Sequence, residues 1–159
     1  MKRAKLGLVL LGCILLVGLS SCAARKNGSV DEAYDLAADS ALRRPANPGA
    51  KIVEIPVSRT DLNRRLALGS SINKARVVEV FSRDGRAGLP EYRLFDVQKE
   101  SALALLGLES ADVLLSAEEI AFSSPDKFSG YVSLLPELKQ GQIEIRRSGA
   151  PIILRYKLN

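Results

Sequence analysis

The chain has 159 residues, of which 47% are hydrophobic and 26% charged, a composition typical of one globular domain with additional segments and not of a multidomain enzyme. Its formal net charge of +5 includes Lys2, Arg3 and Lys5, and without them 20 basic residues stand against 18 acidic ones, which argues against nucleic acid as a partner. The sequence has no histidine, so it lacks the usual general base and the usual zinc ligand.

The N-terminal residues have the pattern of a bacterial lipoprotein signal peptide, residues 1–21. A basic start is followed by an apolar run over residues 6–19, and Leu-Ser-Ser-Cys then gives the order of a lipobox ending at Cys22. The apolar run is shorter than the roughly 20 residues that cross a bilayer. Resemblance to lipoprotein precursors implies a mature chain that begins with acylated Cys22, while Cys13 is removed. An uncleaved helix in the inner membrane is the alternative.

Residues 22–50 are expected to form a lipid-anchored tether. Ala23 after the lipid-bearing cysteine favours the outer membrane, on the periplasmic side of the envelope. The segment ends in Arg-Pro-Ala-Asn-Pro-Gly at residues 44–49, a composition typical of a linker. Residues 30–43 fit either a short helix or a fluctuating linker.

Residues 51–74 are expected to hold a strand and a helix ahead of the main domain. Residues 51–57 are rich in strand formers but contain Pro56, which suits an edge strand or a docking segment. Thr60 is predicted to cap a helix over residues 61–68, which Gly69 ends.

Residues 75–97 are predicted to form a hairpin. Alternating residues at 74–81 favour one strand, Asp84-Gly85 marks the loop over residues 82–88, and residues 92–97 supply the return strand.

A short helix and a buried strand follow this hairpin. The helix is expected to begin near Ser101 and to end at Gly107, with Leu108 folding back onto it. Asp112 then leads into the apolar run at residues 113–115.

A second helix and a closing hairpin complete the chain. Ser124 is expected to cap the helix, with Pro125 at its first position and Pro136 at its end. Its apolar face consists of Phe128, Val132 and Leu135. The closing hairpin joins residues 142–147 and 151–158 around Ser148-Gly149.

The order of strand, short helix, Gly-Leu, acidic residue and buried strand resembles that of the bacterial PDZ domain. The closing hairpin, with Arg147-Ser148-Gly149 in place of the family's Arg-x-Gly, is similar to that of the type II secretion system C component (general secretion pathway protein C). The resemblance implies an α+β fold over residues 75–159, a PDZ-like small antiparallel β-barrel or sandwich capped by two helices. An unrelated α+β domain is the alternative.

By this resemblance a partner's C-terminal peptide would add as a strand between the return strand and the second helix. The competing interpretation is that most of these residues are core, with Arg93 facing solvent. The implied groove consists of a strand edge (Leu94, Phe95, Asp96, Val97), an apolar wall (Phe128, Val132, Leu135) and a carboxylate loop (Tyr92, Arg93).

The chain departs from the family in four ways. Residues 90–95 hold no glycine where peptide-binding PDZ domains place one, and the family's Gly-Asp is Ala111-Asp112. The family's Asn-Gly turn is Glu118-Glu119, and because glutamate accepts positive φ less readily, the turn is expected to differ. The C component's separate secretin-binding domain is expected to be missing.

Catalysis is not expected. Ser101, Ser116, Ser123 and Ser124 have no histidine partner, and adjacent glutamates on a strand point to opposite faces. No cofactor or metal is expected. The sequence favours a non-catalytic periplasmic adaptor in a type II secretion-like assembly, with envelope proteins as partners and the lipid on Cys22 as its membrane contact. The alternatives are a stand-alone module regulating an envelope protease or quality-control factor, and a spacer without a ligand.

Overall fold

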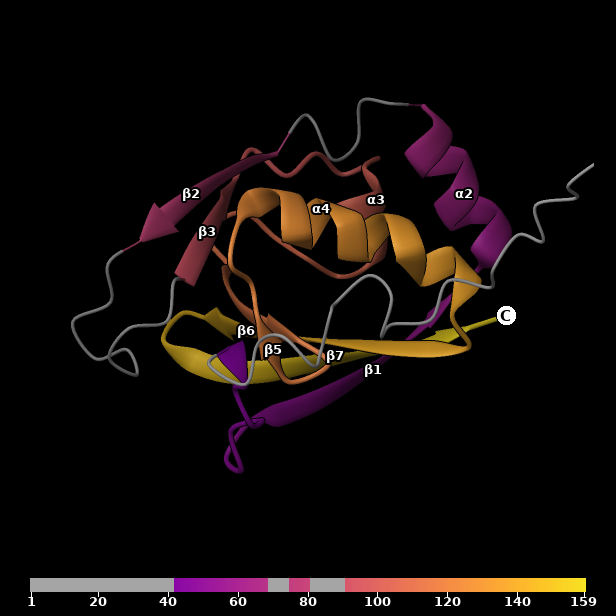
Figure 1. The fold of residues 1–159 in the computed structure, drawn as a ribbon. Helices are drawn as coiled ribbons and strands as arrows, with labels where there is room; N and C mark the ends of the chain where they lie inside the picture. Colours follow the sequence, from indigo (N-terminus) through magenta and orange to yellow (C-terminus); the bar gives the residue numbers. More distant parts are fainter. Residues whose placement is uncertain (1–41, 69–74, 81–90) are drawn as a thin grey trace, which may run out of the picture.

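The computed structural model describes residues 42–68, 75–80 and 91–159 (Figure 1). The signal peptide with Cys22, most of the expected tether, Gly69 and the loop at residues 82–88 lie outside the described residues.

The described chain is built around one seven-stranded sheet with the strand order β1-β7-β6-β4-β3-β2, while β5 pairs with β4 off this path. The strands are β1 (Lys51–Val57), β2 (Arg76–Val80), β3 (Glu91–Phe95), β4 (Val113–Ala117), β5 (Ile120–Ala121), β6 (Gln140–Arg147) and β7 (Ala150–Leu158).

The sheet differs from the expected antiparallel barrel or sandwich in two ways. β1 pairs with β7 in parallel, with Lys51 opposite Ile152, so the sheet is mixed. β1 and β2 stand at opposite ends of the strand order, so the sheet is open and not closed into a barrel. The sheet is mixed because residues 51–57, expected to lie ahead of the domain, form β1 within the sheet, beside β7.

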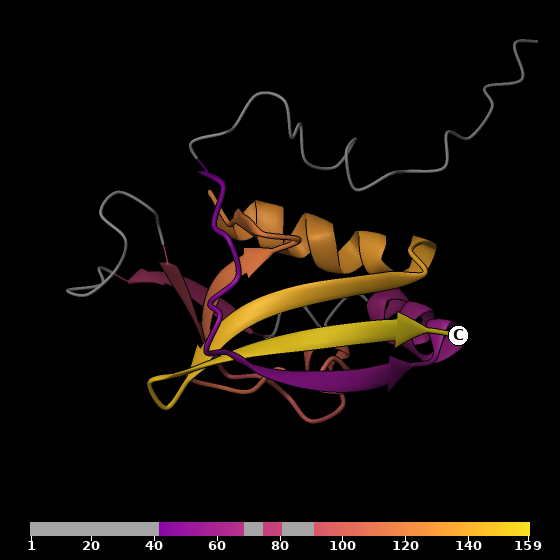
Figure 2. The ribbon, with the colours of Figure 1, turned by 90° about the horizontal axis from the view of Figure 1, so that it is seen from below.

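The described residues form the helices α2 (Arg59–Ala67), α3 (Ala102–Leu105), α4 (Pro125–Leu134) and the 3-10 helix η2 (Leu135–Glu137). In Figures 1 and 2, α4 lies on one side of β6 and β7, and α2 lies near the C-terminal end of β7. The core between helices and sheet includes Leu114, Leu103 and Phe128, all without exposed surface, so residues 113–115 belong to a buried central strand as predicted.

Most predicted helix ends are confirmed. Ser101 accepts a hydrogen bond from the Ala104 N–H at 3.1 Å, and Ser124 accepts one from the Lys127 N–H at 3.3 Å. Gly107 has a φ of 71°, and the Leu108 N–H bonds to the Leu103 carbonyl at 3.0 Å, which completes a Schellman motif.

The cap predicted for the helix at residues 61–68 is wrong by two positions. α2 begins at Arg59, and Ser58, not Thr60, accepts a hydrogen bond from the Asp61 N–H at 3.3 Å. Both residues carry the required hydroxyl, but Ser58 directly follows β1 and keeps the extended backbone that an N-cap needs.

The turn at Glu118-Glu119 has a backbone conformation that the sequence does not predict. Glu118 and Glu119 have φ values of 48° and 63°, so both take the left-handed conformation that Asn-Gly adopts easily. The prediction that this turn differs from the Asn-Gly turn of the PDZ family is therefore wrong. Such a conformation costs roughly 1–2 kcal/mol per L-residue. Tertiary contacts hold it: Glu118 accepts a hydrogen bond from the Tyr131 hydroxyl at 2.6 Å, and the Glu119 carbonyl accepts one from the Arg44 N–H at 2.8 Å.

The described structure begins inside the expected tether. Residues 42–50, called the strap below, run against the sheet before entering β1 (Figure 2). Arg43 forms a bridge with Ile120, and Arg44 is only 8% exposed. This part of the predicted tether is therefore packed onto the domain.

Candidate functional site

The strand predicted to offer its edge to a peptide lies inside the sheet. Leu94 and Phe95 belong to β3, which pairs with β2 on one side and β4 on the other. Leu94 lies opposite Val77 and is fully buried. The prediction of a strand edge here is wrong because two neighbouring strands already occupy both sides of β3.

Asp96 and Val97 lie beyond the end of β3. Asp96 has a φ of 60°, and its carboxylate forms an ion pair with Arg76 at 2.8 Å. The Val97 N–H donates to the Ser110 hydroxyl at 2.9 Å, and its side chain packs against the core. These residues make a corner and offer no strand edge.

The residues predicted as the groove wall belong to the core. Phe128, Val132 and Leu135 have no exposed surface. The Phe128 ring meets Phe122 edge to face, with centroids 5.5 Å apart. This burial agrees with the core interpretation of the apolar face of α4.

The residues predicted as the carboxylate loop lie within β3. Tyr92 is 4% exposed and lies opposite Leu114, and burial together with nearby Glu79 raises the pKa of its hydroxyl. Arg93 is exposed and lies opposite Val78. The loop prediction is wrong because both residues take part in strand pairing.

Among the described strands, β2 stands last at this end of the sheet, and its outer edge pairs with none of the others. The Leu94 N–H bonds to the Asp112 carbonyl at 2.9 Å, so Leu94 directs its backbone away from β2. Because alternate residues of a strand direct their backbone to opposite sides, Arg93 bonds towards Val78, and Val77 and Glu79 direct theirs outward. No strand of the described chain pairs with that side.

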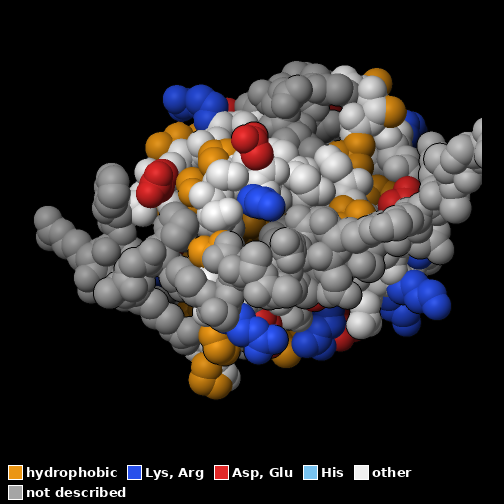
Figure 3. All heavy atoms as spheres, viewed as in Figure 1, with side chains coloured by type: hydrophobic (Ala, Val, Ile, Leu, Met, Phe, Trp, Pro, Cys, Tyr) orange, Lys and Arg blue, Asp and Glu red, His pale blue; other side chains and the backbone are white. Residues whose placement is uncertain are grey.

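The sequence predicts a strand at residues 74–81 but not its place at the end of the sheet. The β2 surface carries both apolar and charged groups. Val78 is 42% exposed, and the Arg76 guanidinium lies 5.5 Å from the centre of the Phe95 ring. On the face seen in Figure 3, Lys and Arg side chains gather mainly along the lower rim, the region of β1, β6 and β7 in Figure 1.

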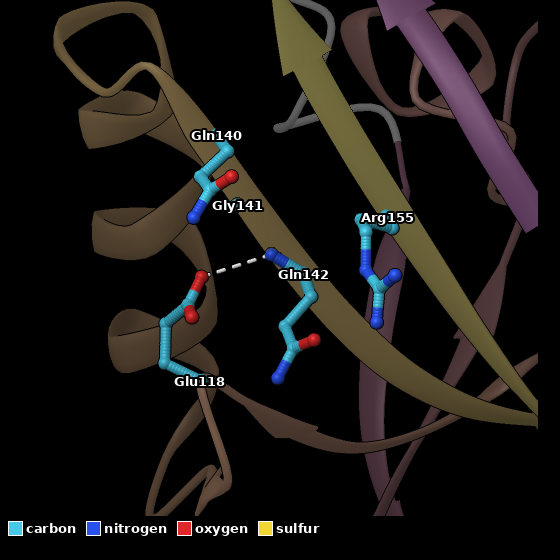
Figure 4. Close-up of a pocket in the computed structure, with 5 residues that line it drawn as sticks. All are labelled: Glu118, Gln140, Gly141, Gln142 and Arg155. Atoms are coloured by element: carbon cyan, nitrogen blue, oxygen red, sulfur yellow. Dashed lines mark hydrogen bonds between the residues drawn. The ribbon is translucent and has the colours of Figure 1, made fainter. Parts of the chain in front are cut away.

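A polar cavity of about 440 Å³ opens beside the Glu118-Glu119 turn (Figure 4). The Glu118 carboxylate accepts hydrogen bonds from the Gln142 N–H at 2.9 Å and the Tyr131 hydroxyl at 2.6 Å. Burial, and then the Glu118 charge, raise the pKa of Tyr131, so its hydroxyl remains a donor. The cavity is lined by Glu118, Gln140, Gly141, Gln142 and Arg155.

Gly141 makes this arrangement possible. A Cβ at this position would lie 2.6 Å from a Leu135 methyl group and 2.7 Å from the Tyr131 hydroxyl. Only glycine therefore lets α4 approach β6 closely enough for Tyr131 to reach Glu118. The cluster of Tyr131, Glu118 and Gln142 explains the strained turn as a structural link between α4, β6 and the β4–β5 connection.

The most deeply buried carboxylates are paired with arginines. Asp112 binds Arg147, and Glu91 binds both Arg44 and Arg146. In residues 42–68, 75–80 and 91–159, no group of three acidic or cysteine side chains could hold a metal ion. No helix within those ranges is long and apolar enough to cross a membrane. The pairs that Asp112 and Glu91 form with arginines support the fold, and these two carboxylates are buried and not placed for acid or base chemistry on a ligand.

Comparison with known proteins gives a distant structural similarity. No family model matches the chain, and no curated protein sequence matches it. Among solved structures, the chain is similar to a fragment of the PDZ domain of EpsC from Vibrio cholerae, with 14% identity and a TM-score of 0.36, over 62% of this chain and 97% of that one. A shorter fragment of the same domain gives 15% identity and a TM-score of 0.34, over 54% of this chain and 95% of that one. Both TM-scores lie below 0.5, so these structures carry no conclusion about the function of this chain.

Proposed function

We propose that this chain is a non-catalytic, PDZ-like interaction module that binds an extended segment of a protein partner along the open edge of β2. The observation that carries the proposal is the outward backbone of Val77 and Glu79 at the end of the sheet. An added strand would gain main-chain hydrogen bonds there, while side chains near Val78 would select its sequence.

The opposite end of the sheet is less suited to strand addition. The Asn159 N–H bonds to the Val57 carbonyl at 3.2 Å, so Val57 faces β7. By alternation, Ile52, Glu54 and Pro56 direct their backbone outward, and Pro56 has no N–H to donate. Proline and a charged residue are common ways of protecting an edge strand, which favours β2 as the binding edge.

The proposal places the module on the periplasmic side of a bacterial envelope, anchored through acylated Cys22 to the outer membrane. The lipobox order and Ala23 support this placement, with an uncleaved inner-membrane anchor as the alternative. The motif order shared with the type II secretion C component supports a role as an adaptor in a similar assembly. The alternative role, regulation of an envelope protease or quality-control factor, would use the same edge, and neighbouring genes would distinguish the two.

A proline substitution in β2 tests the binding edge. Glu79→Pro removes the outward N–H of an exposed residue, while the inward bonds of Val78 to Arg93 remain. Glu79→Ala is the matched control, because it removes the same side chain and keeps the N–H. We expect Glu79→Pro to lose the specific in-cell crosslinks that wild type and Glu79→Ala both form, while its melting temperature stays close to theirs. Equal crosslinking by all three folded proteins would rule out strand addition at β2.

A further inference from the structure

We infer that the strap, residues 42–50, is a latch that couples the N-terminal segment of the chain to the end of the β2–β3 hairpin. Docking of the strap stabilises β2, and release of the strap loosens it. The inference concerns the chain itself and does not depend on the proposed partner.

Arg44 is the centre of the latch. Its guanidinium Nη2 donates to Glu91 Oε1 at 3.1 Å, and its backbone N–H donates to the Glu119 carbonyl at 2.8 Å. The Arg44 side chain is 10% exposed and the Glu91 side chain 1%. Side chain and backbone of one strap residue are thus fixed to two different parts of the domain.

Further contacts hold the strap on both sides of Arg44. Leu42 packs against the core before it. After it, the Asn47 N–H donates to Glu144 Oε1 at 3.3 Å, and Glu144, 6% exposed, also accepts from the Ser116 hydroxyl at 3.4 Å. The strap therefore crosses from the β4–β5 turn to β6 before it enters β1 (Figure 2).

Glu91 connects the latch to the open edge of the sheet. It is the first residue of β3 and lies opposite Val80, the last residue of β2. When Arg44 leaves, Glu91 keeps Arg146, which donates to Oε2 at 2.6 Å and more weakly to Oε1 at 3.4 Å, and Oε1 loses the shorter hydrogen bond from its more deeply buried partner. A buried carboxylate with incomplete pairing moves towards water, because leaving it desolvated is costly. The Val80–Glu91 end of the hairpin then opens, and with it the edge formed by Val77 and Glu79.

The strap thereby gives the N-terminal segment a mechanical connection to β2. Residues before Leu42 join the domain through the strap, so a pull on them reaches the contacts of Arg44 before those of β1. The strap is the element that is either docked or released, and a pull on the residues before it shifts the equilibrium between these two arrangements.

Hydrogen exchange of the full chain tests the coupling. Arg44→Met keeps the length of the side chain and removes its charge, and Arg43→Met is the control at an exposed neighbour. We expect Arg44→Met to raise exchange about 5- to 30-fold in the strap, β2 and β3, the change that one to two kcal/mol of local stability produces. The amides of β6 and β7 should keep their wild-type protection, and Arg43→Met should resemble wild type throughout.

Three results of the exchange measurement would overturn the inference. Faster exchange confined to the strap would show that β2 is independent of it, and an equal rise in β6 and β7 would show a loss of global stability only. Unchanged exchange would show that Arg44 is not the latch. If Arg44→Met fails to fold, Arg44→Met/Glu91→Gln removes both charges of the buried pair and leaves the amide oxygen of the new glutamine as an acceptor for Arg146. The double variant should then fold with a loosened strap, and its failure to fold would also count against the latch.

Discussion

The carboxylate of Asp112 is held by the guanidinium of Arg147 through two hydrogen bonds of 2.7 Å, one to each oxygen. The Asp112 side chain has no exposed surface. Arg147 also donates to the Gly107 carbonyl at 2.8 Å, so it ties the end of β6 to the turn that ends α3. The hydrogen bonds with Asp112 are the main cause that raises the pKa of Arg147, which keeps the guanidinium charged.

Replacing Arg147 by leucine should destabilise the domain strongly. The change leaves Asp112 as a buried carboxylate without its cation, which costs about 3–5 kcal/mol. Arg155→Leu is the matched control, because Arg155 is half exposed and lies 3.8 Å from Glu54, a separation at which an exposed pair contributes about 0–1 kcal/mol. Urea unfolding measures both changes. Equal midpoints for the two variants would contradict the structural role of the Arg147–Asp112 pair.

Alanine substitutions at two glycines should have opposite effects. Gly141→Ala places a methyl group 2.6 Å from a Leu135 side-chain carbon and 2.7 Å from the Tyr131 hydroxyl, and such crowding typically costs about 1–3 kcal/mol. Gly130 lies in α4 with nothing within 4 Å of a new Cβ, so Gly130→Ala should stabilise by roughly 0.5–1 kcal/mol. Thermal unfolding of both variants tests this, and a stable Gly141→Ala protein would disprove the close contact of α4 with β6.

The Glu118-Glu119 turn predicts another pair of opposite effects. Glu119 is exposed with a φ of 63°, so Glu119→Gly should relieve strain and stabilise by about 1 kcal/mol. Glu118→Gln should destabilise by about 1–2 kcal/mol, because the charged acceptor for the Tyr131 hydroxyl and the Gln142 N–H is lost. Denaturant midpoints distinguish the two. If both variants are less stable than wild type, backbone strain at Glu119 is not significant.

Val132→Gln should destabilise the domain and not only block a groove. Val132 has no exposed surface, so the new amide is buried without assured partners, at about 1–3 kcal/mol. Ser133→Gln, at an exposed position of the same helix, should change stability by less than about 0.5 kcal/mol. A Val132→Gln protein as stable as Ser133→Gln would mean that the α4 wall is accessible and would revive the predicted groove.

The proposed lipid anchor predicts that Cys22→Ser abolishes acylation of the chain. Only the thiol accepts the diacylglyceryl group, so the variant should remain unprocessed or lie in the wrong compartment. Metabolic labelling with a fatty-acid probe, with Cys13→Ser as the control, measures this directly. Persistent labelling of the Cys22→Ser protein would remove the basis for the lipid anchor.

Several features of this protein were determined by the sequence itself because their causes lie within a few residues. Ser101 and Gly107 fix the two ends of α3 through bonds to neighbours no more than five positions away. Ser148 and Gly149, with φ values of 51° and 85°, fix the turn between β6 and β7. Such signals are readable because the bonds that they make are local.

Only the tertiary structure determines how the strands pair. It also determines the pairing of residues 92–97, the packing of the strap and the conformation of the β4–β5 turn. Whether residues 92–97 offered an open edge depended on β4 pairing with β3, a choice among distant parts of the chain. The strap packs because Glu91, 47 residues away, accepts the guanidinium of Arg44. The two glutamates of the β4–β5 turn take positive φ because Tyr131, Gln142 and Arg44 offset the local cost. In each case a long-range contact outweighed the local preference, and no pattern confined to neighbouring residues carries that information.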